Sequence, residues 1–196
     1  MSTDSKTASK AIEVIKRGGI VIFPTDTAFG IGCRIDNHKA VDRLFKIRKR
    51  PLSQPMPVLV SSVEMALAYL DSPSDIVRRL MSEYWPGALT IVASCKENLV
   101  YSPIRGNGKT IGVRMPDHET ILAIIRRVGV PILGPSANFH GQPTPFRRQD
   151  LDRHLISLVD LVVPGVCKAG NVSTVIDCSV APPHIIRQGA VTLSIS

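Results

Sequence analysis

The sequence predicts an α/β protein in which helices flank a mixed sheet, with a single domain over residues 8–192. Short apolar runs that are typical of buried strands alternate along the chain with longer segments whose apolar residues recur at a helical period. This alternation is typical of α/β domains. At 196 residues, the chain has the length of one domain with a substantial core.

The predicted elements follow one another with short connections, and we find no internal repeat or linker. We expect helices over residues 8–17, 38–50, 62–70, 73–84, 118–128 and 149–158, and strands over residues 20–23, 30–35, 57–60, 88–93, 109–115, 130–133, 161–163, 173–178 and 184–187.

Glycines and prolines mark the ends of the first elements. Apolar residues at a helical spacing predict the helix over residues 8–17, which two consecutive glycines end. The next four residues, Ile-Val-Ile-Phe, predict a buried strand. Pro24 ends that strand because proline has no N–H to donate to a neighbouring strand. Glycine 30 begins the next predicted strand.

Capping residues and breakers delimit the middle elements. Asn37 is a suitable N-cap for the second helix, which has an apolar face, a strongly basic face and an end at Pro51. Ser62 and Pro73 are typical first residues of the two helices that follow. Trp85-Pro-Gly interrupts the chain before the apolar strand Ala-Leu-Thr-Ile-Val-Ala.

In the last part of the chain, a polar, glycine-containing loop over residues 96–108 precedes a strand. Asp117 or His118 begins the fifth helix, and Gly129 ends it. Gly134-Pro-Ser-Ala-Asn then breaks the next strand. The last helix and three strands complete the expected sheet.

The composition favours anionic partners and gives no sign of a metal site or of export. The 24 Lys and Arg residues exceed the 16 Asp and Glu residues, which gives a formal charge of +8. The four cysteines and five histidines are scattered without the spacing of a zinc site, so we expect reduced thiols in a cytoplasmic protein. We see neither a signal peptide nor an apolar run long enough for a membrane span.

Four polar clusters have the same relation to the predicted sheet, because each of them follows or ends a strand. They are Thr25–Thr27, Thr110 with Arg114, Ser136–Asn138, and Ser173 with Thr174; a fifth, basic cluster is Arg48–Arg50 with Gln54 nearby. Polar groups at strand ends are where α/β sheets bind ligands. A nucleoside triphosphate needs guanidinium and hydroxyl groups of this kind around its phosphates. The alternative is structural: Thr, Asp and Gly are also turn residues, and basic residues also cover solvated helix faces.

Seven segments together resemble the YrdC-like family. They are GGIVIFPTDTAFGIG, LFKIRKRPLSQPMPVLV, WPGALTIV, KTIGVRMP, PILGPSANFHGQPTP, STVIDCS and IIRQGAV, and they run in order from about Ala11 to Val191. The resemblance implies a twisted mixed sheet around a positively charged cavity. It also implies a short form of threonylcarbamoyl-AMP synthase, which joins L-threonine, bicarbonate or CO2, and ATP and releases pyrophosphate. In this family the product serves the t6A modification of tRNA.

The resemblance also assigns the site residues of such a synthase. It implies threonine binding by Thr27, Arg114, Gly134 and Ser173. It implies ATP binding by Arg50, Gln54, Thr110, Ser136, Thr144 and Arg187, and catalysis by Arg48, Arg50, Ser136 and Asn138. We expect Mg²⁺ to accompany ATP, held mostly by phosphate oxygens and water. Asp26 and Asp177 are candidate ligands for that ion, but each has the position of a turn residue.

Two positions depart from the family pattern. Arg48 stands where many members have lysine, and its guanidinium is larger and planar. Leu59 stands where longer archaeal members have histidine. The intact pair Ser136 and Asn138 favours a synthase, whereas Arg48 is also found in a paralogous branch without that pair.

The alternatives are therefore a paralogue with the same fold and another small substrate, or an RNA-binding factor for tRNA or rRNA without synthase activity. A basic concave surface suits structured RNA through phosphate contacts. An aromatic content of 5%, without an aromatic cluster, disfavours binding of single strands by stacking. Other proteins of the t6A pathway are expected partners of a synthase.

Overall fold

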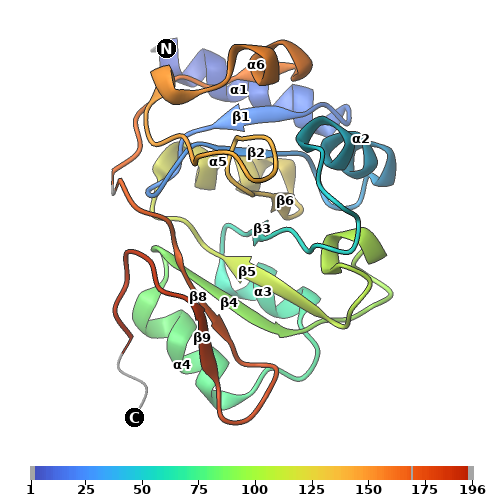
Figure 1. Cartoon of the computed structure of the whole chain (residues 1–196), viewed down its shortest axis with the longest axis vertical. Coiled ribbons are helices and arrows are strands. Elements are labelled where there is room, and N and C mark those ends of the chain that lie inside the picture. The colour runs from blue at the N-terminus through green and yellow to red at the C-terminus, as the bar shows by residue number, and fades with distance from the viewer. Residues whose placement is uncertain (1–2, 169, 194–196) are drawn as a thin grey trace.

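The computed structural model describes residues 3–168 and 170–193, with the backbone alone for residues 3–5. It confirms the α/β class, with helices on the outside of mixed sheets (Figure 1). The helices are α1 (Thr3–Lys16), α2 (His38–Arg48), α3 (Val63–Tyr69), α4 (Asp75–Tyr84), α5 (Glu119–Val128) and α6 (Arg153–Leu158), with 3-10 helices η1 (Ser102–Arg105) and η2 (Arg148–Asp150). The strands are β1 (Val21–Phe23), β2 (Gly30–Gly32), β3 (Val58–Leu59), β4 (Leu89–Ser94), β5 (Thr110–Arg114), β6 (Ile132–Leu133), β7 (Leu161–Val162), β8 (Thr174–Asp177) and β9 (His184–Arg187).

These strands form two sheets, whereas the sequence predicted one. The larger sheet has the order β6-β3-β5-β4-β8-β9, and the smaller has the order β2-β1-β7. Both contain parallel and antiparallel pairs. The two sheets meet at β2 and β6, where Leu133 N donates to Cys33 O over 2.9 Å and Ile31 N donates to Pro135 O over 2.9 Å. Pro131 and Pro135 flank β6 and have no N–H, so these bonds form isolated bridges instead of a continuous ladder.

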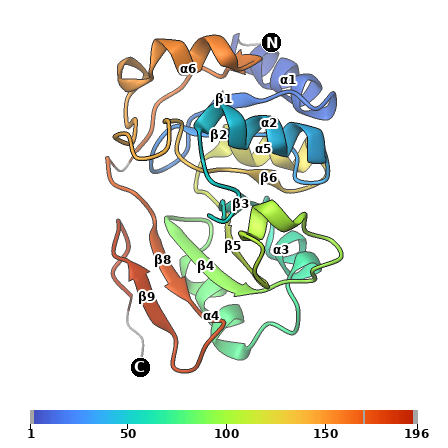
Figure 2. The same ribbon diagram turned by 45° about the vertical axis from the view of Figure 1, so that its right-hand side comes forward.

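Each sheet has its own helical cover. Figures 1 and 2 both show α3 and α4 beside the larger sheet and α2 and α6 beside the smaller one. Helices α1 and α5 pack against each other. Their buried faces, with Ile15 and Ile125 fully enclosed, form one apolar cluster with Phe23 of β1. Burial of each such side chain stabilises the folded protein by roughly 1.5–3 kcal/mol. This cluster therefore fixes the position of β1, the strand that leads into the polar turn at Thr25.

Several boundaries differ from the predicted ones for local reasons. Helix α2 ends at Arg48 and not at residue 50, because Lys49 adopts the left-handed conformation (φ 53°). Strand β2 ends at Gly32, and beyond it Arg34 makes only an isolated bridge with Ile132. The predicted loop over residues 96–108 contains η1, which Gly106 ends with a positive φ of 59°.

Within residues 3–168 and 170–193, no helix combines the length and the apolar character that crossing a membrane requires.

Candidate functional site

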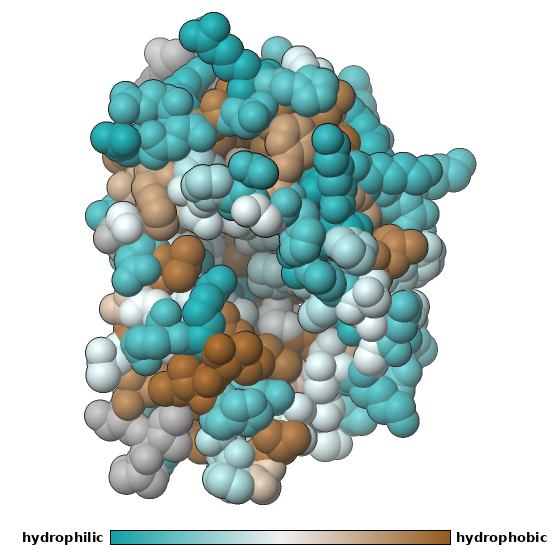
Figure 3. All heavy atoms as spheres, viewed as in Figure 1, coloured by the Kyte–Doolittle hydropathy of each residue, from teal (hydrophilic) through white to brown (hydrophobic). Residues whose placement is uncertain are grey.

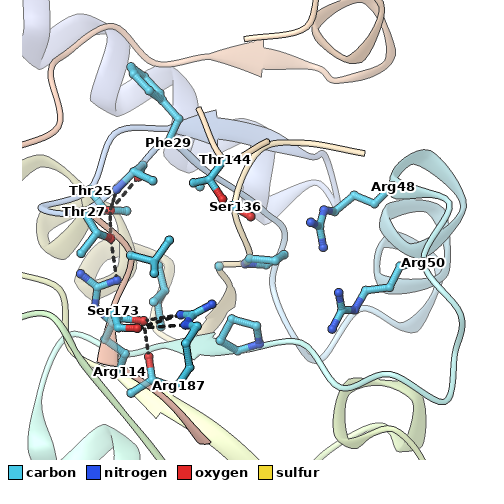
Figure 4. Close-up of a pocket in the computed structure, with 18 residues that line it drawn as sticks. Thr25, Thr27, Phe29, Arg48, Arg50, Arg114, Ser136, Thr144, Ser173 and Arg187 are labelled. Carbon is cyan, nitrogen blue, oxygen red and sulfur yellow. Dashed lines mark hydrogen bonds between the residues drawn. The ribbon is translucent and has the colours of Figure 1, made fainter. Parts of the chain in front are cut away.

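A cavity lies where the two sheets meet, and the polar strand ends of both sheets line it. Its volume is about 180 Å³, which is below the roughly 300–1,000 Å³ of typical ligand pockets. Figure 3 shows the surface hollowed at mid-height, and Figure 4 shows side chains from distant parts of the chain turned toward the same space. The lining residues are Thr25, Thr27, Ala28, Phe29, Gly30, Arg48, Arg50, Pro57, Leu59, Thr90, Arg114, Gly134, Pro135, Ser136, Thr144, Val172, Ser173 and Arg187.

The end of α2 delivers two arginines to this cavity. Lys49 has a left-handed backbone, and its N–H donates to Lys46 O, while the N–H of Arg50 donates to Phe45 O, 3.0 Å away. This turn satisfies carbonyls that the last helical turn leaves open. The side chains of Arg48 and Arg50 both reach the cavity, whereas the Lys49 ammonium lies 5.2 Å from the centroid of the Phe139 ring.

Asn138, which lies outside the cavity lining, fixes the Arg48 side chain by hydrogen bonds. Arg48 Nε donates to the Asn138 carbonyl oxygen and Nη2 donates to Asn138 Oδ1, each over 3.0 Å. The Ser136 hydroxyl donates to the same Oδ1 over 2.7 Å. Asn138 Nδ2 in turn donates to the carbonyl of Gln142. Ser136 and Arg48 line the cavity and Asn138 does not, so Asn138 acts on the site through its two neighbours.

The Arg48 guanidinium is buried with part of its hydrogen-bonding capacity unused. The side chain is 3% exposed, and its Nη1 atom has no hydrogen-bond partner among the described residues. Burial, together with the charge of Arg50, lowers the pKa of Arg48 to about 10. A buried cation that lacks a counterion is costly. An anion in the cavity would therefore be stabilised by Arg48 and would relieve that cost.

Arg50 is held by the loop that follows α2. Its Nε donates to Gln54 O over 3.1 Å, its Nη2 to Pro55 O over 2.7 Å, and its Nη1 to His140 Nδ1 over 3.3 Å. Burial lowers the pKa of Arg50. Neutral acceptors fix the orientation of this guanidinium without compensating its charge.

On the opposite side, Arg114 at the end of β5 is fixed by three acceptors. Its Nε donates to Gly87 O over 2.9 Å, its Nη1 to Thr27 Oγ1 over 2.8 Å, and its Nη2 to Asp26 Oδ1. Asp26 and Arg114 form an ion pair in which each residue is 6% exposed. A guanidinium has five N–H groups, so this one keeps two for a ligand.

The turn after β1 carries Thr25 and Thr27 to the same side of the cavity. Thr25 Oγ1 accepts hydrogen bonds from the backbone N–H groups of Thr27 and Ala28 over 3.1 and 3.2 Å, as turn-forming threonines do. It also lies 3.0 Å from Thr27 Oγ1. Thr25 and Thr27 thus belong both to the predicted turn and to the lining of the cavity.

Arg187 on β9 is held by Ser173. Its Nε and Nη2 donate to the Ser173 carbonyl oxygen over 3.1 and 2.9 Å, and Nη2 is also 3.1 Å from Ser173 Oγ. That hydroxyl lies 3.0 Å from Thr90 Oγ1 on β4. Burial and, to a lesser degree, the charge of Arg114 lower the pKa of Arg187.

Gly134 leaves room at the floor of the cavity. A Cβ atom at this position would lie 2.3 Å from Leu59 Cγ, so a larger residue would displace the Leu59 side chain. Leu59 and Gly134 therefore form a closely packed pair that lines the cavity beside the polar groups.

Most of the predicted site residues converge on this cavity. The lining includes Thr27, Arg48, Arg50, Arg114, Gly134, Ser136, Thr144, Ser173 and Arg187. Three others do not line it: Gln54, whose carbonyl accepts from Arg50; Thr110, which pairs with Ser94 at the far end of β5; and Asn138. The roles of Gln54 and Thr110 in ATP binding stay predictions.

Sequence reasoning missed the role of Asp26 and the contribution of Thr90. Asp26 belongs to the predicted polar cluster Thr25–Thr27 and was a candidate turn residue or metal ligand, but its role as the ion-pair partner of Arg114 was not predicted. Thr90 lies within an apolar strand segment, where nothing but its hydroxyl set it apart. The alternation of side chains along β4, with Thr90 on the face opposite its apolar neighbours Leu89 and Ile91, is the signal that would have indicated it.

The carboxylates near the site do not form a metal centre. Among residues 3–168 and 170–193, no group of three His, Cys, Asp or Glu side chains is placed to hold a metal ion. Asp26 is engaged with Arg114, and Asp177 Oδ1 accepts from the backbone and hydroxyl of Ser179, as expected for a turn residue. The lining is rich in N–H and O–H donors, which suits an anion better than a bare cation.

Comparison with known families places the chain in a single group. A family model for the Sua5, YciO and YrdC proteins, described as "Telomere recombination", matches residues 13–189. The threonylcarbamoyl-AMP synthase of Bacillus subtilis (strain 168) is 32% identical over 98% of this chain and 56% of that protein.

Two solved structures have a similar fold. Pyrococcus abyssi Sua5 in complex with L-threonine aligns with a TM-score of 0.87 and 31% identity, covering 96% of this chain and 55% of the other. Escherichia coli YciO aligns with a TM-score of 0.84 and 25% identity, covering 94% and 89%. The chain thus spans about half the length of the synthases it matches and most of the length of YciO.

Proposed function

The chain belongs to the Sua5/YciO/YrdC family, and from this we propose that it is a threonylcarbamoyl-AMP synthase. The observation that carries the proposal is the convergence of four arginines and several hydroxyls, from elements spread between residues 25 and 187, on one cavity. The proposed reaction consumes L-threonine, bicarbonate and ATP and yields threonylcarbamoyl-AMP, pyrophosphate and water.

One side of the cavity suits a triphosphate. Arg48 and Arg50 come from the end of α2, and Ser136 adds a hydroxyl that donates to the same Asn138 oxygen as Arg48 (Figure 4). No carboxylate among the described residues pairs with either arginine, so both keep their full charge for phosphate oxygens. Thr144 lies beside Ser136 and supplies a further hydroxyl.

The other side suits an amino acid. Arg114 would take the carboxylate of threonine, and the hydroxyls of Thr27 and Ser173 border the same space. Leu59 and Gly134 provide a small apolar floor. The structure of P. abyssi Sua5 with L-threonine, which has a TM-score of 0.87 to this chain, supports threonine as the amino acid.

The reaction needs orientation and charge stabilisation more than a protein nucleophile. The neutral amine of threonine adds to CO2 and releases a proton, which gives N-carboxy-threonine. When bicarbonate is the source, its hydroxyl leaves as water. The new carboxylate of N-carboxy-threonine attacks the α-phosphate of ATP, the α–β phosphoanhydride bond breaks, and pyrophosphate leaves. Fixed guanidinium and hydroxyl donors such as Arg48, Arg50 and Ser136 would stabilise the charge on the transferring phosphate. Mg²⁺ would arrive with ATP, whose phosphate oxygens would act as its ligands, since the described residues contain no cluster placed to hold a metal ion.

The test is pyrophosphate release that depends on threonine and bicarbonate. Purified protein with ATP, L-threonine and bicarbonate should release pyrophosphate and form threonylcarbamoyl-AMP, and omission of threonine should abolish both. Arg50→Ala should remove the activity and leave the circular dichroism spectrum unchanged. Arg43→Ala, whose side chain pairs with Asp160 outside the cavity, is the matched control and should stay active. Full activity of Arg50→Ala would contradict the phosphate role.

Arg48 favours a second candidate, a paralogue with another small substrate. The guanidinium is fixed by two bonds to Asn138 and leaves less space than a lysine would. E. coli YciO, an uncharacterised protein that is 26% identical to this chain, is the relative on which this candidate rests. A panel of amino acids in the pyrophosphate assay separates the two, because a synthase responds to L-threonine and a paralogue responds to another amino acid or to none.

RNA binding without catalysis stays a prediction of the sequence. A protein of that class would release no pyrophosphate with any amino acid, and its RNA affinity would fall steeply with salt. The same assay, combined with a salt titration of tRNA binding, therefore tests this alternative.

A further inference from the structure

The four arginines of the cavity differ in one respect that bears on which ligand binds at each end. Arg114 pairs with a carboxylate, that of Asp26. Arg48, Arg50 and Arg187 pair with none among the residues that the structure describes; their partners are carbonyl, amide, hydroxyl and imidazole groups. Arg187 lies on the same side of the cavity as Arg114, where it donates to Ser173 (Figure 4). Asp26 therefore lowers the charge of this end from two guanidinium groups to one, whereas the end with Arg48 and Arg50 has no carboxylate partner among the described residues.

We propose that Asp26 is a specificity-determining residue, which reserves the Arg114 end of the cavity for a zwitterionic amino acid by neutralising Arg114 and so excludes phosphate anions. The inference rests on the proposed function, since it concerns the end at which threonine would bind. Asp26 does not line the cavity, so it acts through Arg114 and does not touch the ligand.

The charges of the two ligands explain why such a residue is needed. Threonine carries one carboxylate and one ammonium and has no net charge, whereas ATP, pyrophosphate and inorganic phosphate are polyanions. An uncompensated arginine in a buried site attracts a polyanion more strongly than a zwitterion, because Coulomb energies grow with charge and with the low local dielectric. Without Asp26, phosphate would compete with threonine for Arg114.

The geometry lets Asp26 neutralise Arg114 without blocking it. Asp26 Oδ1 accepts from Nη2, while Thr27 Oγ1 and Gly87 O accept from Nη1 and Nε. Two N–H groups stay available for the carboxylate of an amino acid. Thr27 and Ser173 add uncharged hydroxyls beside them. With Arg114 neutralised, Arg187 is the one arginine at this end without a carboxylate partner among the described residues, which suits the single charge of a carboxylate better than the charges of a phosphate.

The test compares Asp26→Asn with the wild type for phosphate binding. Asparagine keeps the Oδ1 acceptor and the size of the side chain but removes the charge. With the phosphate end saturated by α,β-methylene ATP, inorganic phosphate is titrated by calorimetry. We expect Asp26→Asn to bind phosphate at least tenfold more tightly than the wild type, and L-threonine to displace that phosphate. Asp26→Glu, which restores the charge, should return the wild-type affinity for phosphate.

The controls separate this role from a purely structural one. Asp36→Asn removes the carboxylate of an ion pair with Arg34 outside the cavity and should leave phosphate binding unchanged. A structural role alone would lower the melting temperature of Asp26→Asn without changing its phosphate affinity. Equal phosphate affinities of Asp26→Asn and the wild type, or phosphate that threonine does not displace, would overturn the proposal.

Two further results need no variant. If phosphate already competes with threonine in the wild type at similar affinity, the proposal is wrong whatever Asp26→Asn does, including a failure to fold. Pyrophosphate release by the wild type is measured separately. If the wild type neither releases pyrophosphate with threonine nor binds threonine, the proposed function and this inference fall together, whereas a failed phosphate result alone overturns only this inference.

Discussion

Asn138 connects Arg48 and Ser136, two cavity residues that are distant in the sequence. Its Oδ1 atom accepts a hydrogen bond from each of them. Replacing Asn138 by alanine removes that acceptor and frees the Arg48 guanidinium to turn away. We expect Asn138→Ala to lower threonine-dependent pyrophosphate release at least tenfold, mainly through kcat, because transition-state stabilisation depends on fixed donors.

The matched control is Asn37→Ala, at the N-cap of the same helix that ends in Arg48. Asn37 Oδ1 accepts from Ala40 N over 3.0 Å. Loss of such a cap costs about 1 kcal/mol of stability, which denaturant unfolding would detect, but KM and kcat should stay near wild-type values. Equal losses of activity in the two variants would show that Asn138 matters only for stability.

The hydroxyl of Ser136 belongs to the phosphate side of the cavity. Ser136→Ala removes a hydroxyl that lies beside Thr144 and donates to the same Asn138 oxygen as Arg48. We expect the KM for ATP to rise about tenfold, which corresponds to about 1.4 kcal/mol, and the KM for threonine to change less than twofold. Steady-state kinetics with each substrate varied in turn provide the measurement, and equal increases in both constants would count against the assignment.

The sequence allows some side chains of the site to be predicted and not others. The arginines and hydroxyls of the cavity were predictable, because their positions in recurring motifs and at strand ends single them out. Their partners were not, since the contact between Arg114 and Asp26 depends on the end of β5 and the turn after β1, which meet only in the folded chain. The catalytic role of Asn138 stays a prediction, and its hydrogen bonds to Arg48, which place it outside the cavity lining, could not be inferred from the motif.

Among the elements, the end of α2 is the one whose local conformation decides the site. Lys49 holds a φ of 53°, which is strained for a residue with a side chain and most strained for a β-branched one. We expect Lys49→Val to lower the free energy of unfolding by about 1–2 kcal/mol and to raise the KM for ATP, because Arg48 and Arg50 diverge from this turn. Urea denaturation and kinetics would measure the two effects.

Lys49→Gly is the control for that prediction, because glycine adopts a positive φ without strain. It also removes the ammonium near Phe139, a contact worth about 0.5–1 kcal/mol at an exposed site. Its stability and its KM for ATP should therefore stay close to those of the wild type. A KM for ATP that rises equally in both variants would assign the effect to the lysine side chain and not to the turn.

The elements themselves were largely predictable, since apolar periodicity and capping residues mark them clearly. The division into two sheets was not, because it depends on which strand edges meet. Periodicity says that residues 132–133 are buried, but not that Pro131 and Pro135 leave β6 joined to β2 only by isolated bridges. The end of α2 at Arg48 also escaped prediction, as Lys49 is an unusual residue for a left-handed position.

For the whole molecule, ligand binding should be tightly coupled to folding, because the lining residues extend from Thr25 to Arg187 and come together only in the complete fold. A ligand that binds only the folded state at about 100 times its Kd adds about 2.7 kcal/mol to the free energy of unfolding. We expect α,β-methylene ATP with L-threonine to raise the melting temperature, and unfolding by urea at several ligand concentrations to follow this relation.

Cys33 offers an independent readout of the same equilibrium. Burial raises the pKa of this thiol to about 12 from an ordinary value of 9.0, so in the folded protein it stays protonated and unreactive at pH 8. Alkylation of Cys33 at pH 8 should therefore proceed at a rate set by unfolding and should slow when ligands are added. Because only the unfolded state loses this proton between pH 9 and 12, the thiol should also make stability fall as the pH rises through that range.

The single domain over residues 8–192 stays a prediction, as do the cytoplasmic location and the pathway partners.

The continuity of the cavity, from Arg114 at one end to Arg48 at the other, has a kinetic consequence for the proposed reaction. N-carboxy amino acids lose CO2 readily in water, so a carbamate released to solvent would largely decompose before it found ATP. Within one chamber it meets the α-phosphate without crossing bulk solvent, and its capture competes only with decarboxylation in place. Scavengers added to the medium should then fail to intercept it, and the yield of adenylate per threonine consumed should not depend on how dilute the protein is.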